Sequence, residues 1–147
     1  MLVPGTELLA TSIGAVDRTD LCKGGETGLH LSPREQSVLW DMEEHFWTSG
    51  ADNARATTAN NAIMIFPYPP GILQGDQIWT HLKQSTGWRS VAMAERRVTR
   101  CHDIAILTYR VSAEKPDVPI YKALCASTYL HDEETWLRIS HQQTHLA

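Results

Sequence analysis

The second half of the chain is a run of long extended segments with short polar connections. Strand-like sequence covers Trp88 to Arg100, Ile104 to Ala113, Ile120 to His131 and Trp136 to Thr144. The links between them are turn-forming, and Asp132-Glu133-Glu134 is a tight turn. Strands joined by such short links pair antiparallel, because a parallel crossover needs a dozen or more residues. The sequence therefore predicts a meander of long strands, which any fold of this chain must accommodate.

Helix-forming sequence precedes this meander. Ser32-Pro33-Arg34-Glu35 fits a capping box with proline at the first helical position, and a helix is expected to run from it to about Thr48. The segments expected next are a short helix from Ala51 to Ala59, strands over Ala62 to Phe66 and Ile72 to Gln74, and a helix from Gly75-Asp76 to near Gly87. Helices first and a sheet later favour the α+β class over alternating βαβ winding.

Composition limits the classes of partner. The chain has 147 residues, a net charge of −4 and 20% charged residues, which suits one domain and gives no electrostatic footprint for nucleic acid. No apolar run approaches the ~20 residues of a membrane span, and the N-terminus lacks the basic start of a signal peptide. We therefore expect a cytoplasmic protein with no nucleic-acid and no membrane partner. Residues 1–31 carry little periodic signal, so we expect an arm, loose or packed on a neighbouring subunit, ahead of a domain over 32–147.

The cysteines and glycines give no sign of a prosthetic group. Cys22, Cys101 and Cys125 are odd in number and form no C-x-x-C motif, so we expect neither a disulfide framework nor a metal site. No glycine-rich phosphate loop or nucleotide fingerprint occurs in the sequence. The expectation is a protein without a cofactor.

The order of the elements resembles the nuclear transport factor 2-like superfamily. The motifs that resemble its uncharacterised SnoaL-like branch are Phe46-Trp47, Ile65-Phe66-Pro67, the segment Gly71 to Gly75, and the segment Trp136 to Thr144. This resemblance covers roughly residues 33–145. It implies a cone-shaped curved sheet, antiparallel or mixed, wrapped around an N-terminal helix, with a cavity at the wide end and a homodimer formed through the outer face of the sheet. The superfamily includes isomerases, dehydratases, cyclases and pure binding domains, so the fold does not fix the activity.

One carboxylate lies on the apolar stripe of the first helix. At 100° per residue this stripe contains Val38, Leu39, Met42 and Phe46, and the indoles of Trp40 and Trp47 extend it. Glu43 falls between Leu39 and Trp47. Burial there would raise the pKa of Glu43 and make it a usable general base. The alternative is a place on the exposed rim of the helix.

Residues two apart on a strand share a face, which sorts the polar groups of the meander. The last strand then places Leu137, Ile139, His141, Gln143 and His145 together. We expect His141 and Gln143 to point inward, the alternative being a dimer face. An inward His141 is the best candidate general base, and a structural histidine bonded to a neighbouring strand is the alternative. Tyr109, Tyr121 and Tyr129 are either donors to a developing oxyanion or ordinary sheet aromatics.

The expected site combines these groups with aromatic residues at the wide end of the cone. The expected catalytic residues are His141, Glu43 and Tyr109. The expected ligand-binding residues are Trp47, Phe66, Tyr68, Trp88, Tyr121, Cys125, Tyr129 and Gln143. Aromatic walls with few polar groups suit a flat apolar or aromatic small molecule. The sequence thus predicts a small-molecule pocket protein, with cofactor-free isomerisation, dehydration or cyclisation by proton transfer as its enzyme class. A non-catalytic ligand-binding domain and a dimeric interaction domain are the alternatives.

Overall fold

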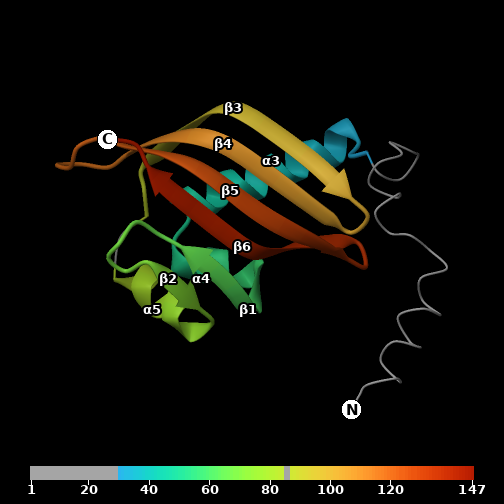
Figure 1. Cartoon of the computed structure of the whole chain (residues 1–147), viewed down its shortest axis with the longest axis horizontal. Helices are drawn as coiled ribbons and strands as arrows, with labels where there is room; N and C mark the ends of the chain where they lie inside the picture. The colour runs from blue at the N-terminus through green and yellow to red at the C-terminus, as the bar shows by residue number, and fades with distance from the viewer. Residues whose placement is uncertain (1–29, 85–86) are drawn as a thin grey trace, which may run out of the picture.

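The computed structural model describes residues 30–84 and 87–147, which form one curved sheet with helices against it (Figure 1). Along the chain the elements are α3 (Pro33–Thr48), α4 (Ala51–Ala56), β1 (Thr58–Ile65), β2 (Ile72–Gln74), α5 (Asp76–Lys83), β3 (Ser90–Cys101), β4 (Ile104–Glu114), β5 (Tyr121–Asp132) and β6 (Thr135–His145). The strand order is β2-β1-β6-β5-β4-β3; β1 and β6 run parallel and all other neighbours antiparallel. The expected α+β class, with a curved mixed sheet and an N-terminal helix on its inner face, is confirmed. The sheet is open rather than closed on itself, and nearly all of the expected arm over 1–31 lies outside the described residues.

Helix α3 begins at the predicted capping box. Ser32 Oγ accepts the Glu35 N–H at 3.0 Å, and Glu35 Oε1 accepts the Ser32 N–H at 3.0 Å. The buried face of α3 consists of Leu39, Trp40, Glu43, Phe46 and Trp47. Val38, predicted on this face, is instead 43% exposed. The buried stripe is centred nearer to Glu43 than predicted, because the sheet offers hydrogen-bond donors to that carboxylate.

The inner faces of β4 and β5 alternate as the period of two predicts. Their buried residues are Ala105, Leu107, Tyr109, Val111 and Ala113 on β4, and Ala123, Cys125, Ser127 and Tyr129 on β5. These side chains and those of α3 form the core between the helix and the sheet.

Strand β6 breaks the alternation with a β-bulge. Arg138 pairs with Tyr129 and Ser140 pairs with Thr128, so Ile139 is an extra residue on β6. Because of this extra residue, Arg138 and His141 both point to the inner face although they are three residues apart, and both are buried. The predicted placement of Ile139 on the same face as His141 is therefore wrong, whereas His141 itself points inward.

Three further expectations need correction. Strand β1 begins at Thr58, four residues before the predicted Ala62, and the preceding helix is correspondingly shorter, because Thr58 pairs with Arg138 across the sheet. Helix α5 ends at Lys83 rather than near Gly87. Cys101, at the end of β3, is disulfide-bonded, which the odd number of cysteines did not predict. Within the described ranges, no helix is long and apolar enough to cross a membrane.

Candidate functional site

Glu43 lies at the centre of a buried hydrogen-bond network between α3 and the sheet. Its Oε2 accepts the hydroxyl protons of Tyr109 and Ser127, each at 2.5 Å. Its Oε1 accepts the hydroxyl proton of Tyr129 at 2.5 Å and lies 3.5 Å from Nη2 of Arg138. Glu43 and Arg138 are both fully buried. The carboxylate is thus satisfied by groups from β4, β5 and β6 together.

Arg138 supplies the positive charge of this network. Its Nη2 donates to Tyr129 Oη at 2.6 Å and to the Met42 carbonyl at 3.1 Å. Its Nη1 donates to the hydroxyls of Thr57 and Thr58, at 3.2 and 3.0 Å. The guanidinium thereby ties β6 to α3 and to the start of β1, the segment where the sequence predicted helix.

The charge state of Glu43 differs from the expected one. Burial alone would raise its pKa, but a hydrogen bond from His141 and the charge of Arg138 outweigh burial and hold the pKa well below its usual range. The expectation of a raised pKa is therefore wrong. Burial, together with the negative charge of Glu43, in turn raises the pKa of the Tyr109 and Tyr129 phenols. An ionised, fully satisfied carboxylate is a weak base near neutral pH.

His141 connects this network to the half-buried polar groups beyond it. Its Nδ1 lies 2.7 Å from Ser127 Oγ and 3.3 Å from Glu43 Oε2. Its Nε2 lies 3.1 Å from the amide nitrogen of Gln143. The amide oxygen of Gln143 accepts the hydroxyl proton of Tyr121 at 2.9 Å. We call this series of hydrogen-bonded side chains, which runs from Tyr121 through Gln143, His141 and Ser127 to Glu43, the relay.

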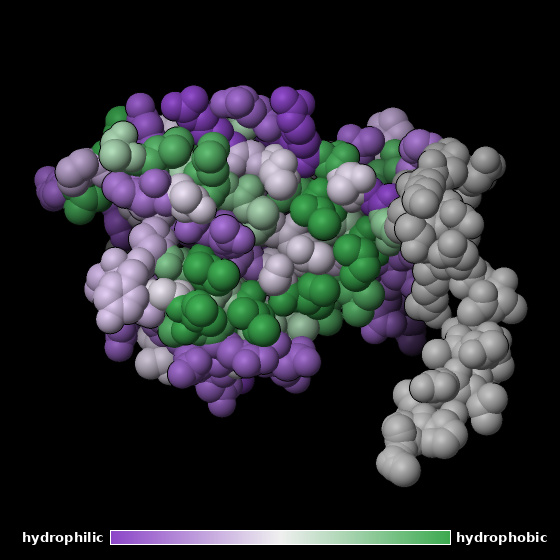
Figure 2. Space-filling view, viewed as in Figure 1, coloured by the Kyte–Doolittle hydropathy of each residue, from purple (hydrophilic) through white to green (hydrophobic). Residues whose placement is uncertain are grey.

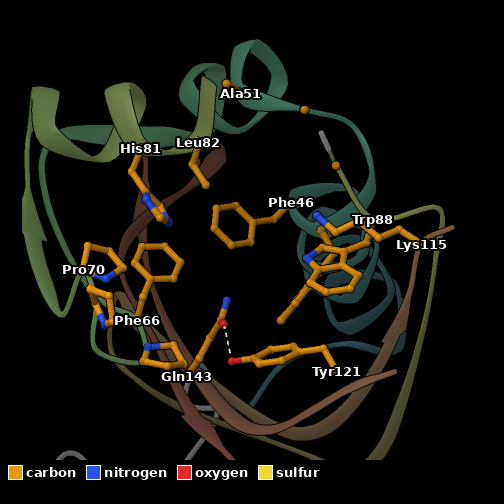
Figure 3. A pocket seen from close by; sticks show the side chains of 15 residues that line it. Phe46, Ala51, Phe66, Pro70, His81, Leu82, Trp88, Lys115, Tyr121 and Gln143 are labelled. Atoms are coloured by element: carbon orange, nitrogen blue, oxygen red, sulfur yellow. Dashed lines mark hydrogen bonds between the residues drawn. The ribbon is translucent and has the colours of Figure 1, made fainter. Parts of the chain in front are cut away.

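A pocket of about 310 Å³ begins where the relay ends (Figure 3). It lies between the C-terminal end of α3, the helices α4 and α5, and the ends of β5 and β6. Its lining consists of Phe46, Trp47, Gly50, Ala51, Phe66, Pro67, Pro69, Pro70, His81, Leu82, Gly87, Trp88, Lys115, Tyr121 and Gln143. Five of these residues are aromatic and none is an aspartate or a glutamate. Gln143 and Tyr121, joined by their hydrogen bond, form its floor on the sheet side.

Contacts between aromatic rings fix the wall of the pocket opposite His81. The N–H of Trp88 donates to the Trp47 carbonyl at 3.1 Å, which holds the chain after α5 against the end of α3. The Trp88 ring stacks on Tyr121 with centroids 5.5 Å apart and an interplanar angle of 21°. His145 stacks on Tyr121 at 5.3 Å. The Lys115 ammonium lies 4.4 Å from the centroid of the Trp88 ring. The Tyr121 ring, and with it the hydroxyl on the pocket floor, is thus held in place.

The predicted ligand-binding residues divide into two groups. Trp47, Phe66, Trp88, Tyr121 and Gln143 line the pocket.

Tyr68 does not line it: its side chain is 90% exposed, and the neighbouring prolines Pro67, Pro69 and Pro70 take the lining positions. Cys125 and Tyr129 are buried among the core residues of β5, outside the pocket lining. For Cys125, burial raises the pKa to about 12, so it remains a thiol. These three residues therefore lie outside the lining of this pocket.

The three predicted catalytic residues do come together, but away from the pocket. Glu43, His141 and Tyr109 are all within the buried network, and none is part of the pocket lining. Sequence reasoning missed the inward position of Arg138 because it assumed an unbroken alternation along β6. The sequence carried no signal of it, because an arginine between the apolar residues Leu137 and Ile139 fits a strand whose arginine faces water.

Comparison with known proteins gives structural matches alone. No family model matches the sequence, and no curated protein matches it. A provisionally named ketosteroid isomerase from Parabacteroides distasonis has a TM-score of 0.66 and 18% identity, covering 82% of this chain and 93% of that one. An NTF2-like protein from Cytophaga hutchinsonii has a TM-score of 0.65 and 10% identity, covering 79% and 100%.

A third solved structure, the CaMKII hub of S. rosetta, has a TM-score of 0.61 and 12% identity, covering 80% of this chain and 100% of that one. At these identities the similarity concerns the arrangement of the backbone. The curved six-stranded sheet around α3, and these three matches to it, show that the chain has the nuclear transport factor 2-like fold.

Proposed function

We propose that this protein binds a small molecule with a flat apolar or aromatic body in the pocket beside Trp88. The observation that supports this is the lining: aromatic rings on several sides and one polar pair, Gln143 and Tyr121, on the floor. Small-molecule sites commonly combine such apolar walls with a few fixed polar groups. A volume of about 310 Å³ lies at the lower end of the range for such sites, which suits a ligand of one or two fused rings.

Native mass spectrometry of the purified protein, followed by calorimetric titration with naphthalene derivatives, tests this proposal. Leu82→Trp introduces an indole into the pocket and is expected to abolish binding. Ile120→Trp, at a side chain that is 54% exposed and outside the pocket lining, is the matched control and is expected to keep binding. Equal binding by the two variants, or no binding by the unmodified protein, would contradict a ligand site in this pocket.

The second candidate function is cofactor-free proton transfer, as in an isomerase, dehydratase or cyclase. It is favoured by the position of His141, which reaches the pocket through one hydrogen bond to Gln143. The Parabacteroides match, provisionally named a ketosteroid isomerase, is consistent with such chemistry. In this scheme Nε2 of His141 accepts a proton from a ligand C–H next to a carbonyl when the Gln143 amide turns aside. Glu43 and Tyr109 act through the relay and the network as positioning residues.

Deuterium uptake by a methyl aryl ketone in heavy water, followed by NMR, tests this second function. Catalysis by His141 predicts uptake faster than in buffer, lost in His141→Ala while binding of the ketone is kept. If the ketone takes up deuterium no faster with the unmodified protein than in buffer, proton transfer is contradicted and ligand binding is the remaining function.

We propose that the protein forms a homodimer through the outer face of its sheet. Figure 2 shows apolar side chains gathered over the sheet and bordered by hydrophilic ones. Ile106 and Leu124 are 38% and 49% exposed on strands β4 and β5, and a shallow groove crosses β3 to β6 beside Leu124. The S. rosetta match is named a hub. Sedimentation velocity is expected to give a dimer for the unmodified protein and a monomer for Leu124→Glu; a monomer in both would contradict this assembly.

A further inference from the structure

We propose that the pocket selects an aromatic alcohol over the corresponding ether, because the relay fixes which atoms of its polar floor donate and which accept. This proposal rests on ligand binding in the pocket and deepens it by naming the polar group that the ligand carries. It follows from the direction of each hydrogen bond between Glu43 and Tyr121.

The direction is set at the buried end of the relay. The Glu43 carboxylate only accepts, so the single hydroxyl proton of Ser127 points to Oε2 of Glu43. Nδ1 of His141 then faces two oxygens that have no proton to give it, Ser127 Oγ at 2.7 Å and Glu43 Oε2 at 3.3 Å. Nδ1 therefore carries a proton and donates it.

The charge balance of the network determines whether the other ring nitrogen of His141, Nε2, carries a proton. Glu43 and Arg138 are fully buried and together carry no net charge. A second proton on the buried His141 ring would leave this cluster with an uncompensated positive charge away from water, which is costly. Nε2 of His141 is therefore without a proton and accepts from the Gln143 amide nitrogen at 3.1 Å.

The hydrogen bond to His141 fixes the orientation of the Gln143 amide, which lines the pocket. With its NH₂ group turned to His141, its oxygen faces Tyr121 and accepts the phenol proton at 2.9 Å. Burial raises the pKa of Tyr121 to about 12, so the phenol keeps the proton that it donates. What the pair then offers a ligand is the second N–H of Gln143 as a donor and the lone pairs of Tyr121 Oη as an acceptor.

A hydroxyl group complements this pair with one atom, because its oxygen accepts from Gln143 and its proton goes to Tyr121. An ether or a ketone accepts from Gln143 but has nothing to give Tyr121. Because His145 and Trp88 both stack on the ring of Tyr121, the phenol stays where such a ligand meets it. The ligand class is therefore an alcohol or phenol carried by the aromatic body that the walls of the pocket accept.

Calorimetric titration with three matched probes tests the selection: naphthylmethanol, its methyl ether and methylnaphthalene, all of the same positional isomer. The alcohol is expected to bind about tenfold more tightly than the ether, the difference that one well-formed hydrogen bond makes. Equal binding of the three, or an ether that binds as tightly as the alcohol, overturns the selection while ligand binding in the pocket stands. Absence of binding by all three overturns both.

Two variants test whether the relay is the cause. Gln143→Met keeps the length of the side chain but frees the Tyr121 hydroxyl to donate to an ether. His141→Phe keeps a ring among Phe46 and Phe66 but frees the Gln143 amide to turn over. Each is expected to reduce the preference for alcohol over ether to about twofold or less. A tenfold preference retained by both variants would overturn the role of the relay; if His141→Phe does not fold, Gln143→Met decides alone.

Discussion

The space between α3 and the sheet has two halves, which differ in the burial and hydrogen bonding of their polar side chains. In the closed half, around Glu43, the polar side chains are fully buried and bonded to one another. In the open half, Tyr121 and Gln143 are only half-buried, and each keeps hydrogen-bonding capacity that faces the pocket. The halves meet at His141, which contacts Ser127 on one side and Gln143 on the other, and at Trp47 in the pocket wall, whose indole N–H donates to the Tyr109 hydroxyl at 2.9 Å.

This difference separates groups that hold the fold from groups that contact a ligand. The residues most reminiscent of catalytic chemistry, a glutamate and a histidine among tyrosines, are buried and lie outside the pocket lining. Their hydrogen bonds connect α3 to β4, β5 and β6 and so position the helix on the sheet. The pocket is formed by side chains that look less reactive, and its polar floor contacts the closed half through the hydrogen bond between Gln143 and His141.

Removing the positive charge of the closed half is expected to have the largest effect on stability. Arg138→Met leaves Glu43 buried without its cation, together with the threonine hydroxyls that the guanidinium satisfies. We expect a loss of about 3–5 kcal/mol in the free energy of unfolding, measured by urea denaturation.

Arg110→Met is the control for that prediction. Arg110 also pairs with a glutamate, Glu95, at 3.5 Å, but both side chains are more than half exposed. Its replacement is expected to cost less than about 1 kcal/mol. A similar cost for the two arginines would show that burial does not distinguish the closed half from the surface.

The pH dependence of stability gives the next largest effect. Glu43 has a lower pKa in the folded state than its ordinary value of 4.5, so its stabilising contribution is present above about pH 4.5 and is lost as the pH falls below it. Glu43→Gln is expected to cost about 3 kcal/mol near neutral pH. Urea unfolding of both proteins from pH 7 down to pH 3 should show this gap narrowing in the acid range. A gap that stays constant to pH 3 would mean that the carboxylate contributes nothing through its charge.

The fold was predictable because its elements are marked locally. The capping box at Ser32 sets the start of α3, and the alternation on β4 and β5 sorts their faces from the sequence alone. Short polar turns such as Asp132 to Glu134 leave antiparallel pairing as the natural outcome. Element order then allowed the resemblance that the structural matches bear out.

The site was predictable only in part, because its assembly depends on register. One extra residue in β6, Ile139, turns Arg138 inward, and no period-two argument anticipates a bulge. The predicted pKa of Glu43 had the wrong direction because burial was foreseen, whereas the hydrogen bond from His141 and the charge of Arg138, which outweigh burial, were not. The position of Tyr68 was mispredicted for a different reason. A proline-rich loop has no periodicity, so its sequence does not indicate which side chain points to the pocket.

The same substitution made in each half gives the finest test of the comparison. Tyr129→Phe removes a hydroxyl that donates to Glu43 and accepts from Arg138, both fully buried, and is expected to cost about 2–3 kcal/mol in the free energy of unfolding. Tyr121→Phe removes a hydroxyl with one half-buried partner, Gln143, which water can satisfy instead, so the expected cost is under about 1 kcal/mol. Urea denaturation measures both. If Tyr121→Phe cost as much as Tyr129→Phe, the open half would stabilise the fold as strongly as the closed half does, and its hydroxyl would not be free to serve a ligand.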